Sequence, residues 1–266
     1  MELEIIGYIA AILVGLSLGL IGGGGSILTV PILVYLLGVE AADTAPAYSL
    51  FIVGTASLIG ACIKYKEGFV DLKTAIIFGL PAIFAVYFTR RILVPAIPDE
   101  IFTIDNFTFT KRIFVMGLFA VLMILASVSM IKGRKDVEQT QPQKFNYPLI
   151  LIEGIVVGII TGLVGAGGGF IIIPALVMLS NLSMKKAVGT SLAIITAKSL
   201  FGFLGDLSVI EIDWKLLLGF TAFAVAGIFI GNKLSNKIDG SKLKKSFGWF
   251  VLIMGTYIFI KELFLN

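Results

Sequence analysis

The chain has 266 residues, of which 58% are hydrophobic and 14% are charged, and its formal net charge is +4. Soluble domains carry about 25% charged and about 45–50% apolar residues, so this composition excludes an ordinary soluble protein and predicts an integral membrane protein. The apolar residues form solid runs, which favours membrane helices over the alternating strands of a β-barrel. There is no histidine and only one cysteine, so we expect no metal site, no cofactor and no disulfide. The basic residues gather between apolar runs, which indicates cytoplasmic loops and no nucleic-acid partner.

Ten apolar segments are predicted as helices of an all-α membrane protein. In chain order they span 5–22, 27–38, 44–63, 72–90, 112–131, 147–165, 169–180, 186–204, 214–232 and 243–264. The second segment of each half has about 12 residues, or about 18 Å of helix, which is shorter than the roughly 30 Å hydrocarbon core. Each short segment directly follows a cluster of glycines, and both a half-length crossing and a re-entrant turn fit its length. The acidic N-terminal residues predict no cleaved signal peptide.

The two halves of the chain are predicted to be repeats of each other. The matching pairs are Gly15/Gly158, Gly19/Gly162, Gly22/Gly165, Gly25/Gly168 and Pro31/Pro174 at an offset of 143, and Ser49/Ser191, Ser57/Ser199 and Asp71/Asp213 at an offset of 142. Chance similarity between apolar helices would not keep glycine, proline and loop charge in register, so the match indicates duplication. We therefore divide the chain into a first repeat at 1–131, a polar cytoplasmic linker at 132–146 and a second repeat at 147–266.

The basic residues also predict the orientation of the chain. Fourteen Lys and Arg residues lie in one alternating set of connections and six in the other. The richer set consists of 64–73, 132–146, 184–186 and 233–245. The positive-inside rule places this set in the cytoplasm and both termini outside, in a multi-pass protein of the cell membrane. The first repeat then starts outside and the second inside, so the repeats have inverted topology. The connection 90–112 fits this orientation least well.

The glycine clusters interrupt membrane helices, and they are the main chemical signal of the sequence. The first cluster is Gly22, Gly23, Gly24, Gly25 and Ser26, and the second is Gly165, Ala166, Gly167, Gly168 and Gly169. Inverted-repeat transporters place broken helices near the membrane midplane, with half-helix ends facing the substrate. A helix N-terminus offers free N–H groups, and consecutive glycines let the backbone approach a ligand closely. We therefore expect the two clusters to meet and to form an anion site lined by backbone.

Close helix packing is the alternative interpretation of these glycines. It is favoured for four isolated glycines, which are Gly15, Gly19, Gly158 and Gly162, whereas an uninterrupted run favours the anion site. Pro31 and Pro174 follow the clusters, and each would either kink a helix or mark a delayed helix start.

Lys198 is the polar residue that lies deepest in an apolar segment. It follows Lys186 by twelve residues, or roughly 18 Å of helix, and an ionised lysine at that depth is costly. We expect it to face the interior and balance a substrate anion; the alternatives are snorkelling toward the outer interface and pairing with Asp206. Glu153 either reaches the cytoplasmic headgroups or carries a coupling proton.

Hydroxyl groups are further candidates for substrate binding. Thr190 and Ser191 precede Lys198 by about two helical turns and so share its face, and Ser49 is the repeat counterpart of Ser191. These hydroxyls either bond an oxyanion or bond the carbonyls of their own helix.

The stretch from Glu153 to Leu207, EGIVVGIITGLVGAGGGFIIIPALVMLSNLSMKKAVGTSLAIITAKSLFGFLGDL, strongly resembles the sulfite exporter TauE/SafE family. In the first half, GLSLGLIGGGGSILTVPILVYLLG resembles the first repeat of the same family, so the resemblance spans essentially the whole chain. It implies a secondary transporter of small anions such as sulfite and organosulfonates, with the glycine clusters and the AVGTSL segment as its site. Two positions depart from the family: Tyr48 stands where threonine is usual, and Lys198 where asparagine is expected.

These observations predict a secondary transporter, and not an enzyme, that exports sulfite, a sulfonate or another sulfur oxyanion by alternating access between the repeats. The inside-negative membrane potential favours anion exit by about 2.3 kcal/mol per charge per 100 mV. Export therefore needs no coupling ion, whereas import would need one, a proton or sodium. A passive anion channel is the alternative function. Besides the bilayer and the anion, the sequence indicates no partner and no oligomeric state.

Overall fold

The computed structural model describes residues 2–23, 25–40, 42–104, 107–132, 147–179, 182–235 and 240–264. Gly24 and residues 133–146 of the predicted linker lie outside the described residues. The helices are α1 (Glu2–Ile21), α2 (Ser26–Pro31), α3 (Thr44–Lys66), α4 (Leu72–Phe88), α5 (Val94–Ala96), α6 (Lys111–Lys132), α7 (Tyr147–Val164), α8 (Gly169–Leu179), α9 (Met184–Asp206), α10 (Trp214–Ser235) and α11 (Gly240–Phe264). Two π-helical turns are η1 (Ile32–Leu36) and η2 (Thr89–Leu93), and two strands are β1 (Glu100–Ile104) and β2 (Phe107–Thr110).

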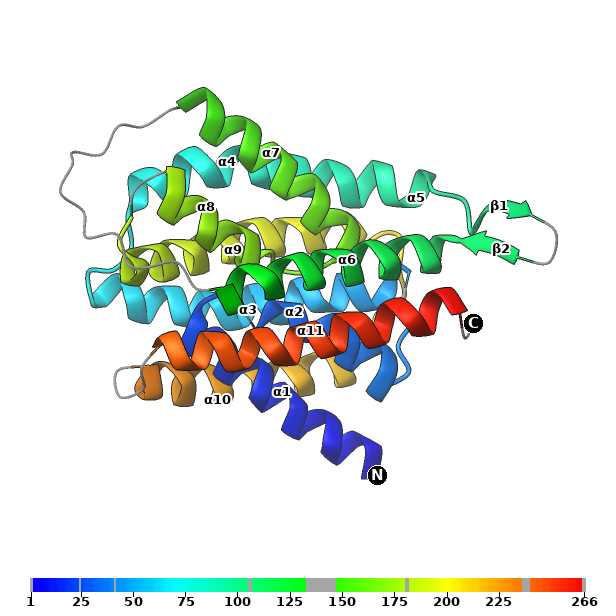
Figure 1. Ribbon diagram of the computed structural model, residues 1–266, viewed down its shortest axis with the longest axis horizontal. Coiled ribbons are helices and arrows are strands. Elements are labelled where there is room, and N and C mark those ends of the chain that lie inside the picture. The colour runs from blue at the N-terminus through cyan, green and yellow to red at the C-terminus, as the bar shows by residue number, and fades with distance from the viewer. Residues whose placement is uncertain are drawn as a thin grey trace.

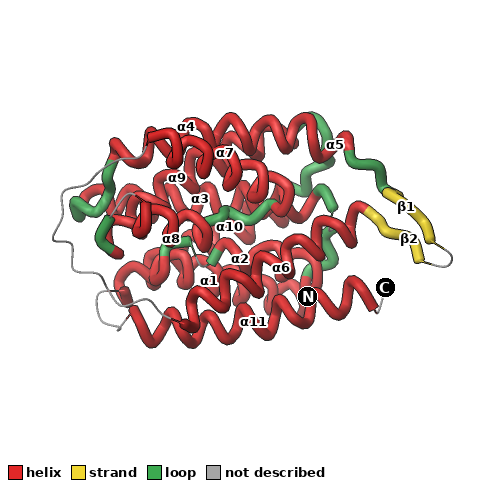
Figure 2. The backbone as a smooth tube through the Cα atoms, turned by 45° about the horizontal axis from the view of Figure 1, so that its top comes forward, coloured by secondary structure: helices red, strands yellow, loops and turns green. Residues whose placement is uncertain are grey.

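The long helices run side by side along the long axis of the molecule (Figure 1). In the part of the chain that the structure describes, five helical stretches are long and apolar enough to cross a membrane. They are Thr44–Lys66, Leu72–Ala96, Lys111–Lys132, Met184–Asp206 and Trp214–Ser235. Strands β1 and β2 form an antiparallel hairpin, which extends beyond the helices at the end of the bundle where the C-terminus lies (Figure 2). The predicted all-α membrane class is confirmed, although the hairpin was not expected from the sequence.

Both glycine clusters interrupt the helical path, as predicted. Residues 22–25 separate α1 from α2, and residues 165–168 separate α7 from α8. Gly22, Gly165 and Gly168 have φ angles of +80°, +72° and +70°. A residue with a Cβ rarely adopts this left-handed conformation, so glycine is required for the chain to turn at these points.

The first short helical stretch is re-entrant. A Cβ at Gly7, near the start of α1, would lie 2.6 Å from the Leu37 side chain, which follows η1. The chain therefore returns from the glycine break toward the end at which α1 begins, and α8 runs back in the same manner toward the start of α7 (Figure 1). The delayed helix start considered for Pro31 is wrong, because α2 already begins at Ser26. Pro31 lacks an N–H group, and the π-helical turn η1 begins at the next residue.

Isolated glycines in α1 and α7 pack the two halves of the chain against each other. A Cβ at Gly15 in α1 would overlap the backbone carbonyl of Ala224 in α10. A Cβ at Gly158 in α7 would lie 2.7 Å from the carbonyl oxygen of Ala82 in α4. Ala82 and Ala224 are themselves repeat counterparts, so each repeat supplies the helix that the other packs against. The packing interpretation is confirmed for these glycines, while the inverted topology stays a prediction.

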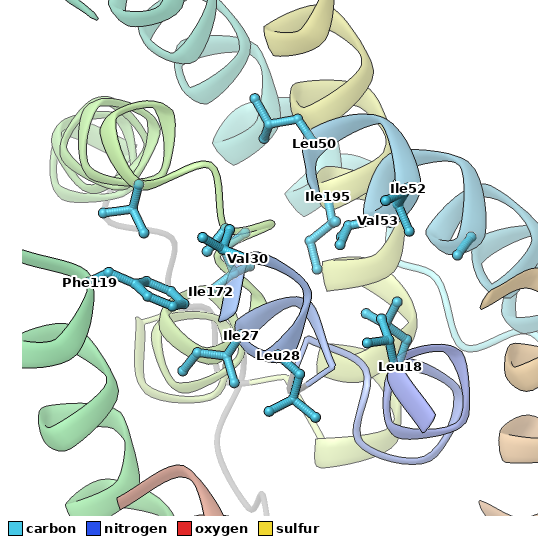
Figure 3. Packing of buried hydrophobic residues seen from close by; sticks show 14 of the residues in the cluster. Leu18, Ile27, Leu28, Val30, Leu50, Ile52, Val53, Phe119, Ile172 and Ile195 are labelled. Carbon is cyan, nitrogen blue, oxygen red and sulfur yellow. The ribbon is translucent and has the colours of Figure 1, made fainter. Parts of the chain in front are cut away.

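Buried apolar side chains from α1, α2, α3, α6, α8 and α9 belong to one core (Figure 3). Leu18, Val53, Phe119, Ile172 and Ile195 are fully buried members of this core. Inside a bilayer, such packing stabilises the fold mainly by dispersion contacts, because lipid tails are as apolar as the side chains. The glycine breaks are also closely packed, because an added Cβ at Gly23, Gly25, Gly165, Gly167, Gly168 or Gly169 would lie less than 3 Å from a neighbouring atom.

Candidate functional site

The two glycine breaks meet in the interior of the bundle. A Cβ added to Gly23 would overlap Gly169, and a Cβ added to Gly169 would overlap Gly23. The prediction that the clusters meet is therefore confirmed. We call their described residues the glycine junction, which consists of Gly22, Gly23, Gly25, Ser26, Gly165, Ala166, Gly167, Gly168 and Gly169. All of these residues are buried, so the junction is closed to solvent in this conformation.

The second half of the junction presents a row of backbone donors. Gly165 N–H donates to Thr161 O at 2.9 Å, and Ile172 N–H donates to Gly168 O at 3.0 Å. Between them, the N–H groups of Gly167–Gly169 have no backbone acceptor among the described residues. These donors lie at the N-terminus of α8, where a helix offers partial positive charge. Backbone N–H groups without a partner at a helix N-terminus are the kind of donor that anions bind in proteins.

One face of α3 lies against the second half of the junction. A Cβ at Gly165 would overlap Pro46, and a Cβ at Gly167 would lie 2.5 Å from Val53. Ser49 follows Pro46 by three residues and precedes Val53 by four, so it lies on the same helix face. Its Oγ is fully buried and has no hydrogen-bond partner among the described residues. Ser49 is therefore a free hydroxyl on the face that packs against the junction.

Helix α9 covers the junction from its other side. A Cβ at Gly22 would lie 3.4 Å from Ser191 Oγ, and a Cβ at Gly169 would lie 2.7 Å from Ile195 Cδ1. The Ser191 hydroxyl donates to Val188 O in its own helix at 2.8 Å. Ser191 thus lies at the junction as predicted, with its hydroxyl in the intrahelical bond that was the alternative for such groups.

Lys198 reaches the second half of the junction. Its side chain is fully buried, and Nζ donates to Thr161 Oγ1 at 2.8 Å. Thr161 in turn donates to Val157 O at 2.7 Å, so its hydroxyl accepts from Lys198. A Cβ at Gly168 would lie 3.1 Å from Nζ. No described carboxylate pairs with Lys198, and snorkelling is wrong because the side chain is fully buried.

Lys198 has no counterpart in the first repeat. At the repeat offsets, Ala56 corresponds to Lys198 and Leu18 corresponds to Thr161. Both Ala56 and Leu18 are fully buried members of the apolar core. The hydrogen-bonded pair of Lys198 and Thr161 therefore makes the second half of the junction polar, where the corresponding residues of the first half are apolar.

Thr190 does not contribute to the junction in this conformation. Its Oγ1 accepts a hydrogen bond at 2.9 Å from the N–H of Asp71, the N-cap residue of α4. In the first repeat, the Tyr48 hydroxyl accepts a hydrogen bond from the N–H of Asp213 at 2.5 Å. Tyr48 and Asp71 are the repeat counterparts of Thr190 and Asp213. The two hydroxyls therefore form matching ties between the two predicted repeats, and Tyr48 makes its bond with a tyrosine where the counterpart is a threonine.

Removing either tie should lower stability. We expect Thr190→Val and Tyr48→Phe each to reduce the free energy of unfolding by about 0.5–1.5 kcal/mol, because a backbone N–H loses its acceptor. The measurement is the thermal unfolding of each purified variant in detergent. Thr196→Val is the matched control, since the Thr196 hydroxyl bonds only Leu192 O in its own helix. Equal stability of Thr190→Val and Thr196→Val would contradict the assignment of a tie between repeats.

A buried ion pair, which the sequence did not indicate, joins η2 to the C-terminal end of α9. Arg90 is fully buried in η2, and its Nε donates to both carboxylate oxygens of Asp206 at 2.7 and 2.8 Å. The same guanidinium donates to Asp43 O at 3.0 Å and to Gly162 O at 3.4 Å. Asp206 therefore pairs with Arg90, and its proposed pairing with Lys198 is wrong. Arg90 fastens the connection between η1 and α3 to both α7 and α9.

Glu40 also holds the connection between η1 and α3 in place. The carboxylate accepts hydrogen bonds from the N–H groups of Ala42, Asp43 and Thr44. Burial alone would raise the pKa of Glu40, but these donors and the nearby Lys111 hold it below its ordinary value. The carboxylate stays ionised at neutral pH and orders the entry to α3.

Glu153 lies in α7 at a half-buried position, away from the residues that form the junction. Its Oε2 is buried and has no hydrogen-bond partner among the described residues. The next residue, Gly154, packs closely against Phe78 and Pro81 of α4. Glu153 thus borders the contact between α4 and α7, and its roles at the headgroups or in proton coupling stay predictions.

The fold and the junction define a polytopic α-helical membrane protein with two broken helices that meet in its core, an arrangement found in secondary transporters. The chain belongs to the sulfite exporter TauE/SafE family, whose sequence model matches residues 7–258. It is a membrane transporter of that family.

Similar proteins from bacteria and an archaeon support this assignment. A probable membrane transporter protein of Xylella fastidiosa is 28% identical over 254 residues, covering 92% of this chain and 91% of that protein. The probable membrane transporter protein YdhB of Bacillus subtilis is 27% identical, covering 88% and 91% of the two chains. The probable membrane transporter protein MJ0441 of Methanocaldococcus jannaschii is 26% identical, covering 97% and 94%. No solved structure matches the chain.

Proposed function

We propose that this transporter exports a small sulfur oxyanion, sulfite or a sulfonate, and that it binds the anion at the glycine junction. The observation that carries the proposal is the fully buried amino group of Lys198, which lies beside Gly168 without a described carboxylate partner. A buried cation without a counter-ion is unfavourable, and a bound anion would supply that counter-ion. The family to which the chain belongs favours a sulfur anion over other anions.

The remaining junction donors suit an oxyanion. The N–H groups of Gly167–Gly169 can each donate to an oxygen, and the Ser49 hydroxyl can add a further bond. Backbone donors that are fixed before binding do not have to be ordered by the ligand, which favours affinity. Ser191 would join this set if its hydroxyl turned away from Val188 O.

Alternating access would open the closed junction to one side at a time. The tie from Thr190 to Asp71 and the tie from Tyr48 to Asp213 each join one repeat to the other. If the repeats rock against each other, release of one tie while the other holds would expose the junction to a single side. Outward movement of the anion is downhill in the membrane potential and requires no coupling ion.

Flux measurements in proteoliposomes test the proposal. We expect saturable sulfite exchange, with radiolabelled sulfite accumulating against an internal pool of unlabelled sulfite. Lys198→Met should lower the exchange rate roughly tenfold or more, because the described junction loses the one side chain that can pair with an anion as a full positive charge. Lys215→Met, which changes an exposed lysine at the start of α10, is the matched control and should leave exchange unchanged. Unsaturable conductance without exchange would instead establish the passive anion channel.

A further inference from the structure

The buried cations of the protein differ in how their charge is balanced. Among the described residues, four buried side chains carry a formal positive charge, which are Lys64, Arg90, Lys111 and Lys198. Lys64 pairs with Glu67 at 2.8 Å, Arg90 with Asp206 at 2.7 Å, and Lys111 with Asp43 at 2.8 Å. Lys198 bonds only the neutral hydroxyl of Thr161. Of these four side chains, Lys198 alone has no carboxylate partner among the described residues, and it lies at the junction.

The repeat does not duplicate this charge. A site built from two equivalent halves would carry either two lysines or none, but Ala56 occupies the position that corresponds to Lys198. The buried guanidinium of Arg90 already lies against the Asp206 carboxylate. The other donors at the junction are backbone N–H groups and hydroxyls, which orient an oxyanion but carry no formal charge. Lys198 is therefore the one group at the described junction that can carry a full positive charge, which a bound anion would stabilise.

We infer that the junction selects anions with a single negative charge and discriminates against dianions of the same size. The inference rests on the proposed function and adds the charge class of its substrate. A monoanion such as a sulfonate or hydrogensulfite would form a neutral pair with the Lys198 ammonium inside the closed junction. A dianion such as sulfate or thiosulfate would leave one negative charge uncompensated in a site closed to water, which is strongly unfavourable.

Methanesulfonate and sulfate are a matched pair of probes, because they are nearly equal in size and differ by a methyl group in place of one charged oxygen. We expect the purified protein to bind methanesulfonate roughly tenfold or more tightly than sulfate at equal ionic strength. Affinity is measured by competition against radiolabelled sulfite, whose own binding is measured in parallel. Lys198→Met should abolish the difference between the probes, and the wild-type comparison stands even if that variant does not fold.

The outcomes separate the two proposals. Methanesulfonate binding more tightly than sulfate supports the charge selection. Sulfate binding as tightly as methanesulfonate, or sulfite binding without methanesulfonate binding, overturns the charge selection and leaves the proposed function standing. Absence of binding for all three anions overturns the proposed function, and the charge selection with it.

Discussion

Gly169→Ala is expected to destabilise the transporter severely, because a Cβ at this position would overlap the Cα of Gly23. Two backbone segments are in contact there, so no flexible side chain can move aside to make room. Overpacking of a well-packed core costs about 1–3 kcal/mol and sometimes more, and we expect Gly169→Ala to reach or exceed the upper end of that range. Gly23→Ala should have a similar effect, since the overlap is reciprocal. The measurement is the thermal unfolding midpoint of the detergent-purified protein.

Gly117→Ala is the matched control for this prediction. Gly117 lies in the interior of α6, and a Cβ there would meet nothing within 4 Å. Alanine favours a helix interior over glycine by about 1 kcal/mol, so this variant should be as stable as the wild type or slightly more stable. If Gly169→Ala unfolded at the same temperature as Gly117→Ala, the two glycine breaks would not be in backbone contact.

The contact between the two glycine breaks could largely be predicted from the sequence, because glycine runs inside apolar segments have few interpretations. Four consecutive glycines cannot continue a lipid-exposed helix at low cost, so helix breaks at both clusters followed from local physics. Repetition of the pattern after 143 residues implied that the breaks are related and adjacent. The structure confirms the breaks, the short helices that follow them and their meeting point.

The partners of individual polar groups were harder to predict, because they depend on how distant helices are placed. Thr190 and Ser191 are neighbours in sequence, yet Ser191 lies at the junction while Thr190 bonds Asp71. A difference of about 100° around the helix axis separates the two side chains. The sequence alone does not reveal which of these directions faces the junction.

The partner of the Tyr48 hydroxyl could not be predicted from the sequence either. The resemblance to the family led us to expect threonine at this position, so tyrosine suggested that the hydroxyl pattern is asymmetric. The structure shows that its phenolic hydroxyl makes the bond to Asp213 that corresponds to the bond between Thr190 and Asp71. Sequence comparison registers the change of residue type, whereas the longer tyrosine side chain brings an equivalent oxygen to the equivalent partner.

The second large effect is expected at Arg90. Arg90→Met removes the guanidinium from a pair in which both partners are buried, and leaves the Asp206 carboxylate without its counter-ion. Loss of one member of a buried pair typically costs about 3–5 kcal/mol, so the unfolding midpoint should fall by several degrees. Arg91→Met is the matched control, because Arg91 is exposed and bonds only the Ser208 hydroxyl. Its effect should stay within about 0.5 kcal/mol.

The double variant Arg90→Met/Asp206→Leu distinguishes charge imbalance from loss of packing. Replacing both charges with apolar groups removes the unpaired carboxylate, so the double variant should be more stable than Arg90→Met alone. Recovery should be incomplete, because Asp43 O and Gly162 O still lose the donors that Arg90 supplied. If the double variant were no more stable than Arg90→Met, the contribution of Arg90 would lie in those two carbonyl bonds and in its packing. Arg90 would then hold the repeats together without depending on the charge of Asp206.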